Sequence, residues 1–356
     1  MGWRRCLGGC LAWFVTGGNG DAIEEEKRKV RQSCLSVNTN VISASLRLTQ
    51  IPDRIAQISQ PFASFGIVRN PRYKNSGAFL ALSDFLTFAK DKPLSGVLIS
   101  IEHAAFMDQQ LGFGVVDSVI SSLNDAGYNK TTLEVMIQSS DSAVLLRFKQ
   151  LTKYKLVYQI DKSIRDAINS SVADIKTFAN AVALDKLSIY PSTQLFTTGE
   201  TGRVSQLRAA GLDVYAYVLR NEFVSQPWDF LSDPTVEINA YVAGAGVDGI
   251  ITDFPGTTRR YKRSSCRNLG SDVPIYMQPI EAGQLLSLMT PNSLPPALSP
   301  IPPLTVSDVV EPPLPSVSRS VSPRAAPPSL QPSSGQRDAI PLLVSLVTAC
   351  GFLLLV

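Results

Sequence analysis

The chain has 356 residues, a formal net charge of +3 and 18% charged residues. Its length leaves room for one α/β barrel of about 250 residues with tails on either side. The small charge, without a Lys/Arg block interleaved with aromatic residues, argues against nucleic-acid binding. Five cysteines without a CxxC pair argue against a zinc site.

Residues 1–45 form an atypical N-terminal segment. Arg4 and Arg5 precede a short apolar run that glycines interrupt, which is a weak secretory signal pattern. The charge-dense run at 24–29 is typical of a solvated helix. Residues 20–45 are poorly patterned, and the alternation of strands and helices begins at about Leu46.

Residues 46–266 alternate between short apolar runs and amphipathic stretches. The apolar runs predict parallel strands covered on both faces, at 97–102, 133–138, 154–160, 181–184, 214–219 and 249–253. Between them lie helical patterns, one ending near Gly127 and another starting at the plausible cap Asp141. This alternation predicts a TIM-type (β/α) barrel. A full barrel needs about eight such units, so we expect this one to be incomplete at its N-terminal end.

The apolar run at 97–102 places Glu102 at the end of a predicted strand. The next residue, His103, is the one histidine of the chain. Ligands in α/β barrels are held at the carboxyl ends of the strands. From physics alone, a glutamate in such a place is a salt-bridge residue about as often as a ligand. Alternation directs His103 away from Glu102, so we expect it to be a rim residue. Arg147, Lys153 and Arg220 could contact a phosphate, although isolated basic residues are usually solvated.

Other polar residues of the predicted barrel have structural explanations. Tyr215 and Tyr217 alternate with apolar neighbours, which predicts packing in the core. Asp248 and Asp253 are expected to hold the loop and the helix start after the last strand. Pro255 is well placed for the first turn of that helix.

Residues 267–335 change in character and become rich in proline and serine, which predicts an extended, O-glycosylated stalk. The sequons at Asn129 and Asn169 fit a secreted surface. Both asparagines are therefore candidate glycosylation sites.

Residues 336–356 begin with a polar spacer and end in an uncharged apolar run. The small residues Ser333, Ser334 and Gly335 precede the spacer. Small residues, a polar spacer and a terminal apolar run together form the pattern of a cleaved GPI-anchor signal. The alternative is a tail-anchored transmembrane helix. An anchor signal functions only on a chain that has entered the secretory pathway. Either the weak N-terminal segment suffices as a signal or the sequence has lost its true start, and we favour the second.

The stretch from Gly246 to Pro255 resembles the closing strand of the glycerophosphodiester phosphodiesterase family, a group of TIM barrels. The strand of Glu102 resembles the Glu-Ile-Lys strand whose glutamate binds the metal in that family. The stretches at 83–86, 135–139, 221–227 and 261–263 are similar to the plant glycerophosphodiester phosphodiesterase-like proteins, which are GPI-anchored at the cell surface and tied to wall organisation. The resemblance covers most of the chain, from about residue 46 into the stalk.

This resemblance implies hydrolysis of glycerophosphodiesters to glycerol 3-phosphate and an alcohol, with a divalent metal, Ca²⁺ or Mg²⁺, held in part by Glu102. It also implies a place at the outer leaflet of the plasma membrane, facing the cell wall. The family's His-Arg-Gly strand and its second histidine are absent from this sequence, and Ala104 stands where the family has lysine. Acid–base catalysis needs positioned proton donors and acceptors, and one carboxylate binds metal weakly. The alternative is therefore a catalytically inactive surface protein that binds cell-wall polymers or assists wall organisation.

Overall fold

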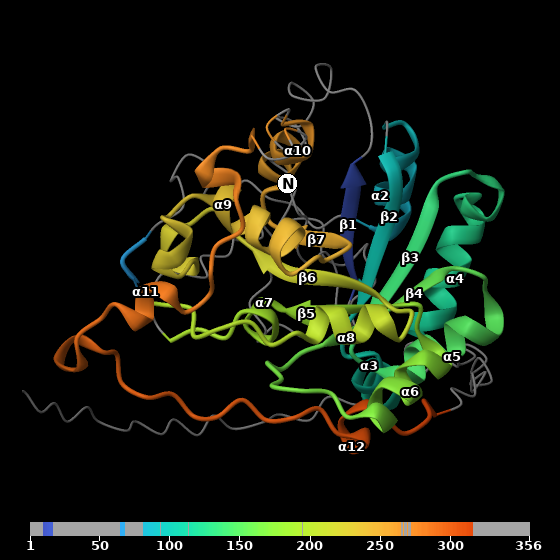
Figure 1. The fold of residues 1–356 in the computed structure, drawn as a ribbon. Coiled ribbons are helices and arrows are strands. Elements are labelled where there is room, and N and C mark those ends of the chain that lie inside the picture. Colours follow the sequence, from blue (N-terminus) through green and yellow to red (C-terminus); the bar gives the residue numbers. More distant parts are fainter. Residues whose placement is uncertain are drawn as a thin grey trace, which may run out of the picture. The chain divides into compact units, whose positions relative to one another are not determined.

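The computed structural model describes residues 10–16, 65–67 and 81–315, apart from short gaps at positions 93, 113, 194, 265, 267–268 and 270–271. Within this part the main feature is a sheet of seven strands in chain order, from β1 to β7 (Figure 1). The strands are β1 (Cys10–Thr16), β2 (Leu94–Ile101), β3 (Glu134–Ser139), β4 (Lys155–Ile160), β5 (Ala181–Asp185), β6 (Asp213–Leu219) and β7 (Gly249–Thr252). All six predicted strands are confirmed, with boundaries shifted by three residues at most.

The strands from β2 to β7 are parallel, and β1 pairs antiparallel with β2. No pairing joins β7 to β1 in the described sheet. Since a closed barrel of this type has about eight parallel strands, the six parallel strands form an incomplete TIM-type barrel. The predicted fold class and its incompleteness are both confirmed.

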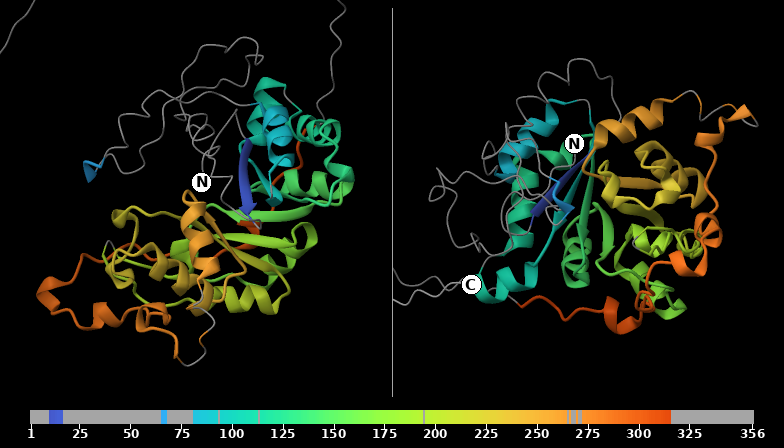
Figure 2. Two further views of the ribbon diagram at one scale, coloured as in Figure 1. Left: turned by 90° about the horizontal axis from the view of Figure 1, so that it is seen from above. Right: turned by 90° about the vertical axis from the view of Figure 1, so that its left-hand side faces the viewer.

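Helices follow the strands and cover one face of the sheet (Figures 1 and 2). The longer ones are α2 (Leu82–Lys90), α3 (Ala104–Leu111), α4 (Val115–Asp125), α5 (Ser142–Leu151), α6 (Asn169–Phe178), α8 (Arg203–Ala209), α9 (Pro234–Asn239) and α10 (Pro255–Arg263). Short turns of helix are η4 (Tyr128–Lys130), α7 (Lys186–Ile189), η5 (Phe223–Ser225), η6 (Trp228–Phe230), η7 (Ala240–Gly244), η10 (Ile275–Met277), α11 (Gln284–Ser287), η11 (Pro291–Ser293) and α12 (Val306–Val309).

Two helix starts follow from local chemistry. The side chain of Asp141 accepts a hydrogen bond of 2.9 Å from the backbone N–H of Ala143, so the predicted cap of α5 is confirmed. Pro255 occupies the first turn of α10, where its missing N–H costs nothing. Each helix is thereby fixed directly after a strand.

Alternation along the strands gives the sheet two different faces. The outer face, with residues such as Val97, Ile99 and Ile101, packs against the helices in the main core. The inner face carries a second apolar cluster, in which Leu98, Met136, Val157, Ala181, Ala183 and Ile251 pack with the half-buried Tyr215, Tyr217 and Val218. The two tyrosines are thus packed inside the barrel, as predicted.

The proline-rich segment returns to the barrel at residues 302–311. The backbone of Leu304 donates to the Asp166 carbonyl at 2.7 Å and accepts from the Ile168 N–H at 3.4 Å. The side chains of Leu304 and Val309 are almost fully buried in the main core. We call residues 302–311 the C-terminal strap.

Among the described residues, no helix has the length and apolar character required to cross a membrane. The predicted anchor signal at 336–356 and its attachment residues Ser333, Ser334 and Gly335 lie outside the described part. The anchor and the predicted domain limits stay predictions.

Candidate functional site at the carboxyl ends of the strands

The inner face of the sheet becomes polar toward the carboxyl ends of its strands. Ser100 and Gln138 stand side by side on β2 and β3, and both are almost fully buried. Gln138 donates from Nε2 to Oε1 of Gln159 on β4, whose own Nε2 donates to Oδ1 of Asp161. The Oγ of Ser100 has no hydrogen-bond partner in the described structure. Buried polar groups of this kind are usually satisfied, so this row is suited to contact with a polar ligand.

Glu102 follows β2 directly and is half-buried at the carboxyl end of the sheet. His103 is exposed and has a φ of 56°, a left-handed backbone conformation at the start of α3. Its carbonyl accepts a hydrogen bond of 3.1 Å from the Met107 N–H. The exposure of His103 agrees with the expectation that it is a rim residue.

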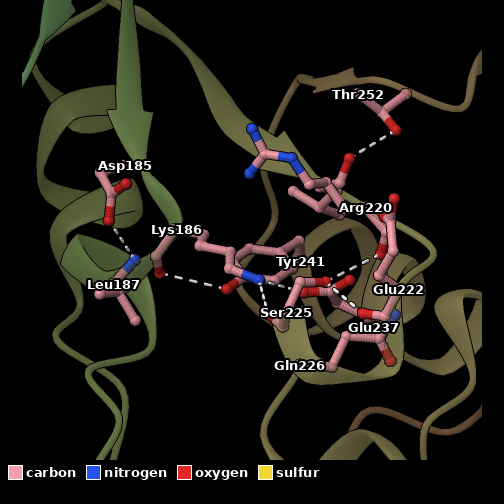
Figure 3. A network of polar contacts seen from close by, with 11 residues as sticks. Asp185, Lys186, Leu187, Arg220, Glu222, Ser225, Gln226, Glu237, Tyr241 and Thr252 are labelled. Carbon is pink, nitrogen blue, oxygen red and sulfur yellow. Dashed lines mark hydrogen bonds and ion pairs between the residues drawn. The ribbon is translucent and has the colours of Figure 1, made fainter. Parts of the chain in front are cut away.

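A buried ion pair lies beyond the ends of β5 and β6 (Figure 3). Lys186 is the first residue of α7, and its Nζ lies 3.0 Å from Oε1 of Glu237 on α9. The side chains of Lys186 and Glu237 are 14% and 1% exposed. The same Nζ donates to the Ser225 carbonyl, and the Tyr241 hydroxyl donates to the Lys186 carbonyl at 3.2 Å. Burial raises the pKa of Glu237, and the charge of Lys186 opposes that rise.

Arg220 lies at the carboxyl end of β6 beside this pair. Its Nε donates to Oδ2 of Asp253 at 2.8 Å, with the two side chains 16% and 14% exposed. The Arg220 carbonyl accepts from Gln226 Nε2 at 3.0 Å and from Ser225 Oγ at 3.3 Å. Because Lys186 holds Ser225, the buried ion pair also fixes the loop that carries Arg220.

Asp185 ends β5 and has a structural role. Its Oδ1 accepts from the Leu187 N–H at 2.8 Å and from Ser163 Oγ at 3.1 Å, so it caps the short helix α7. Burial raises the pKa of this carboxyl group. The capping bonds position Lys186, the next residue, toward Glu237.

The described residues do not fit a divalent metal by themselves. Among them, no three Asp, Glu, His or Cys side chains gather into a group that could hold an ion. Sites for Ca²⁺ or Mg²⁺ usually draw on several oxygen ligands, and Glu102 supplies one carboxylate.

The model of the glycerophosphoryl diester phosphodiesterase family matches residues 36–257. The chain belongs to this family. The match includes β2 to β7, the half-buried Glu102 and the pairs formed by Lys186 and Arg220. The resemblance seen in the sequence is thereby confirmed.

Several curated proteins of Arabidopsis thaliana are similar to this family member. Glycerophosphodiester phosphodiesterase GDPDL1 is 46% identical over 86% of the chain, and glycerophosphodiester phosphodiesterase GDPDL3 is 44% identical over 86%. Protein SUPPRESSOR OF NPR1-1 CONSTITUTIVE 4 is 45% identical over 80% of the chain. The chain spans 41% of the length of each of the first two relatives and 25% of the third. It is a protein of the plant glycerophosphodiester phosphodiesterase-like type.

The other candidate residues of this family member lie away from the site. Arg147, on α5, pairs with Asp117 of α4 at 2.8 Å on the outer surface. Lys153 precedes β4, at the amino end of the sheet. Asn129 and Asn169 are exposed, on η4 and at the start of α6. Their glycosylation stays a prediction.

The predicted role of Asp248 is wrong. This residue precedes β7, and its Oδ2 accepts from the Val214 N–H at 2.9 Å while Oδ1 lies 3.3 Å from Arg208. Asp248 therefore holds the start of β6 rather than the loop after the last strand. The helix start there is held by Thr252, whose Oγ1 accepts from the Phe254 N–H at 3.0 Å.

The two residues of the buried ion pair were missed in the sequence, and so was the polar row of Ser100, Gln138 and Gln159. Lys186 follows Asp185 directly after an apolar strand, and polar residues at that point of a barrel strand are candidates for a site. That signal could have found Lys186. Glu237 gives no comparable signal, because it lies 51 positions further along the chain on a helix.

Proposed function

We propose that this chain binds glycerophosphodiesters at the carboxyl ends of its strands and that it does not hydrolyse them by itself. The family match over residues 36–257 is the observation that supports glycerophosphodiesters as the substrate class. The phosphodiesterase names of relatives such as GDPDL1 and GDPDL3 support it. The ligand would contact the polar row of Ser100, Gln138 and Gln159, and Arg220, directly after β6, supplies a cation at the same end of the sheet.

Arg220 is suited to bind the phosphate group. A guanidinium group has five N–H donors in a planar fork that matches phosphate oxygens. The Nε bond to Asp253 and the two bonds to the Arg220 carbonyl fix the position of this residue before a ligand arrives. Such preorganisation reduces the entropy lost on binding.

Binding of glycerophosphocholine to the purified chain tests this role. We expect Arg220→Gln to weaken binding about tenfold or more, because a charge-assisted hydrogen bond contributes about 1.5–3 kcal/mol. Titration calorimetry measures the affinity, with Arg147→Gln as the matched control on the outer surface. The double variant Arg220→Gln/Asp253→Asn removes the unpaired carboxylate, in case the single variant folds poorly. Equal affinities in the wild type and in both Arg220 variants would contradict the proposal.

The lack of hydrolysis follows from the residues available for proton transfer. General acid and base groups must lie within hydrogen-bond reach of the reacting atoms. The sequence has one histidine, which is exposed on the rim, and Ala104 stands where the family has lysine. We propose that Ca²⁺ or Mg²⁺ binds only weakly at Glu102, since this carboxylate is the family's one recognisable ligand here.

We expect the chain to release no glycerol 3-phosphate from glycerophosphocholine when Ca²⁺ or Mg²⁺ is added. An enzyme-coupled assay for glycerol 3-phosphate measures this, with a metal-free sample as the blank. Divalent-dependent turnover that disappears in Glu102→Ala would show that the chain is a competent phosphodiesterase.

A second candidate function is a non-catalytic protein that binds cell-wall polymers. The shortage of catalytic groups favours it as well, and the proline- and serine-rich composition after the C-terminal strap fits a surface stalk. We propose a GPI anchor, glycans at Asn129 and Asn169, and a position at the plasma membrane facing the wall for either function. Release of the protein from plant membranes by a phosphatidylinositol-specific phospholipase tests the anchor.

A further inference from the structure

A lysine-rich groove lies at the amino ends of β4 and β5, at the opposite end of the sheet from the candidate site. It has a volume of about 480 Å³ and is formed by the last turns of α5 and α6 and by the loops that lead into the two strands. Four of its ten lining residues are lysines and none is acidic: Lys149, Thr152, Lys153, Tyr154, Lys155, Leu156, Lys176, Phe178, Ala179 and Asn180. Pockets of this size hold small molecules.

Two of these lysines are already engaged. Nζ of Lys155 lies 2.6 Å from Oδ2 of Asp213, and Nζ of Lys149 donates to the Thr177 carbonyl at 2.6 Å. Lys153 and Lys176 are exposed, and neither forms an ion pair or a hydrogen bond with another described residue. The groove therefore has two ammonium groups available to a ligand.

Lysines near the carboxyl end of a helix often bind its last carbonyl groups, and here that role is filled by other donors. The Phe148 carbonyl at the end of α5 accepts from the backbone N–H of Thr152 at 2.8 Å and from its Oγ1 at 2.9 Å. The Ile175 carbonyl of α6 accepts from the Ala179 N–H at 2.8 Å. Capping thus does not account for Lys153 and Lys176.

We propose that this groove binds a phosphate-bearing molecule. The ammonium group is a compact point charge that binds phosphate without the planar geometry required by a carboxylate–arginine pair. Asp213 neutralises one of the four lysines, and the absence of acidic lining residues leaves the groove positively charged. The apolar wall of Leu156, Phe178 and Ala179 can contact the organic part of the ligand. This site is independent of the function proposed above.

Binding of inorganic pyrophosphate to the full chain, measured by titration calorimetry, tests the proposal. We expect Lys153→Gln/Lys176→Gln to weaken binding at least about tenfold, since hydrogen bonds to charged groups are lost. Lys130→Gln is the matched control, because Lys130 is exposed on η4 and does not line the groove. A second arm measures sedimentation with phosphatidylcholine vesicles that contain phosphatidic acid.

Loss of pyrophosphate binding in the double variant, but not in Lys130→Gln, would support the proposal that phosphate binds in the groove. Vesicle binding that shows the same loss would identify a lipid headgroup as the source of the phosphate, and binding of pyrophosphate without vesicles would identify a soluble ester. The proposal is overturned if the wild type binds neither probe, or if the double variant binds as well as Lys130→Gln.

Discussion

Replacement of Lys186 by methionine should lower the free energy of unfolding of this chain by about 3–5 kcal/mol. The substitution leaves the Glu237 carboxylate, with 1% of its side chain exposed, without the ammonium group 3.0 Å away. It also removes the donor to the Ser225 carbonyl and so loosens the loop of Arg220. Urea unfolding of the full chain measures the change.

The double variant Lys186→Met/Glu237→Met separates the cost of an unpaired buried charge from a loss of packing. Replacing both members of a buried ion pair with apolar residues is often neutral or stabilising, so we expect most of the lost stability to return. Arg147→Met is the surface control, since Arg147 and Asp117 are 41% and 54% exposed. Exposed pairs contribute about 0.2–1 kcal/mol. A loss in Lys186→Met no larger than in Arg147→Met would contradict the role of the buried pair.

The effect of Lys186→Met should depend on pH in a defined direction. Burial raises the pKa of Glu237 above its ordinary value of 4.5, and removal of Lys186 raises it further. A carboxyl group with a raised pKa binds more protons in the native state, so stability falls as pH rises from the unfolded pKa to the folded one. The difference between wild type and variant should therefore be smallest below pH 4.5 and should increase toward neutral pH.

The strands of this fold could be predicted because their signal is local. Each consists of a continuous apolar run, and β2 to β7 appear within three residues of their predicted boundaries. The cap at Asp141 and the helix start at Pro255 were equally local. Asp248 was misassigned because its partner, Val214, is 34 positions away, and nothing in the neighbouring residues indicates that pairing.

In the candidate site, too, the residues with a local sequence signal could be predicted and those held by distant contacts could not. Glu102 could be placed at a strand end from the apolar run before it, and the exposed position of His103 follows from the end of that strand. The pairs of Lys186 with Glu237 and of Arg220 with Asp253 depend on contacts 51 and 33 positions apart. These pairs form only when the fold brings residues distant in the chain together.

The C-terminal strap lies in a region whose composition predicts only an extended stalk, and it yields the second large effect. Leu304→Ala should lower the free energy of unfolding by about 2–5 kcal/mol, the usual cost of truncating a buried leucine. Leu304 is 1% exposed, and its backbone bonds to Asp166 and Ile168 fix the side chain against the core.

Leu298→Ala is the matched control for the strap, in the same proline-rich region, because Leu298 is 53% exposed. We expect a change within about 0.5 kcal/mol for this surface substitution. Similar small losses in both variants would mean that residues 302–311 do not stabilise the barrel. A large loss confined to Leu304→Ala would show that the strap is part of the folded domain, where Leu304 is buried and forms a parallel bridge with Ala167.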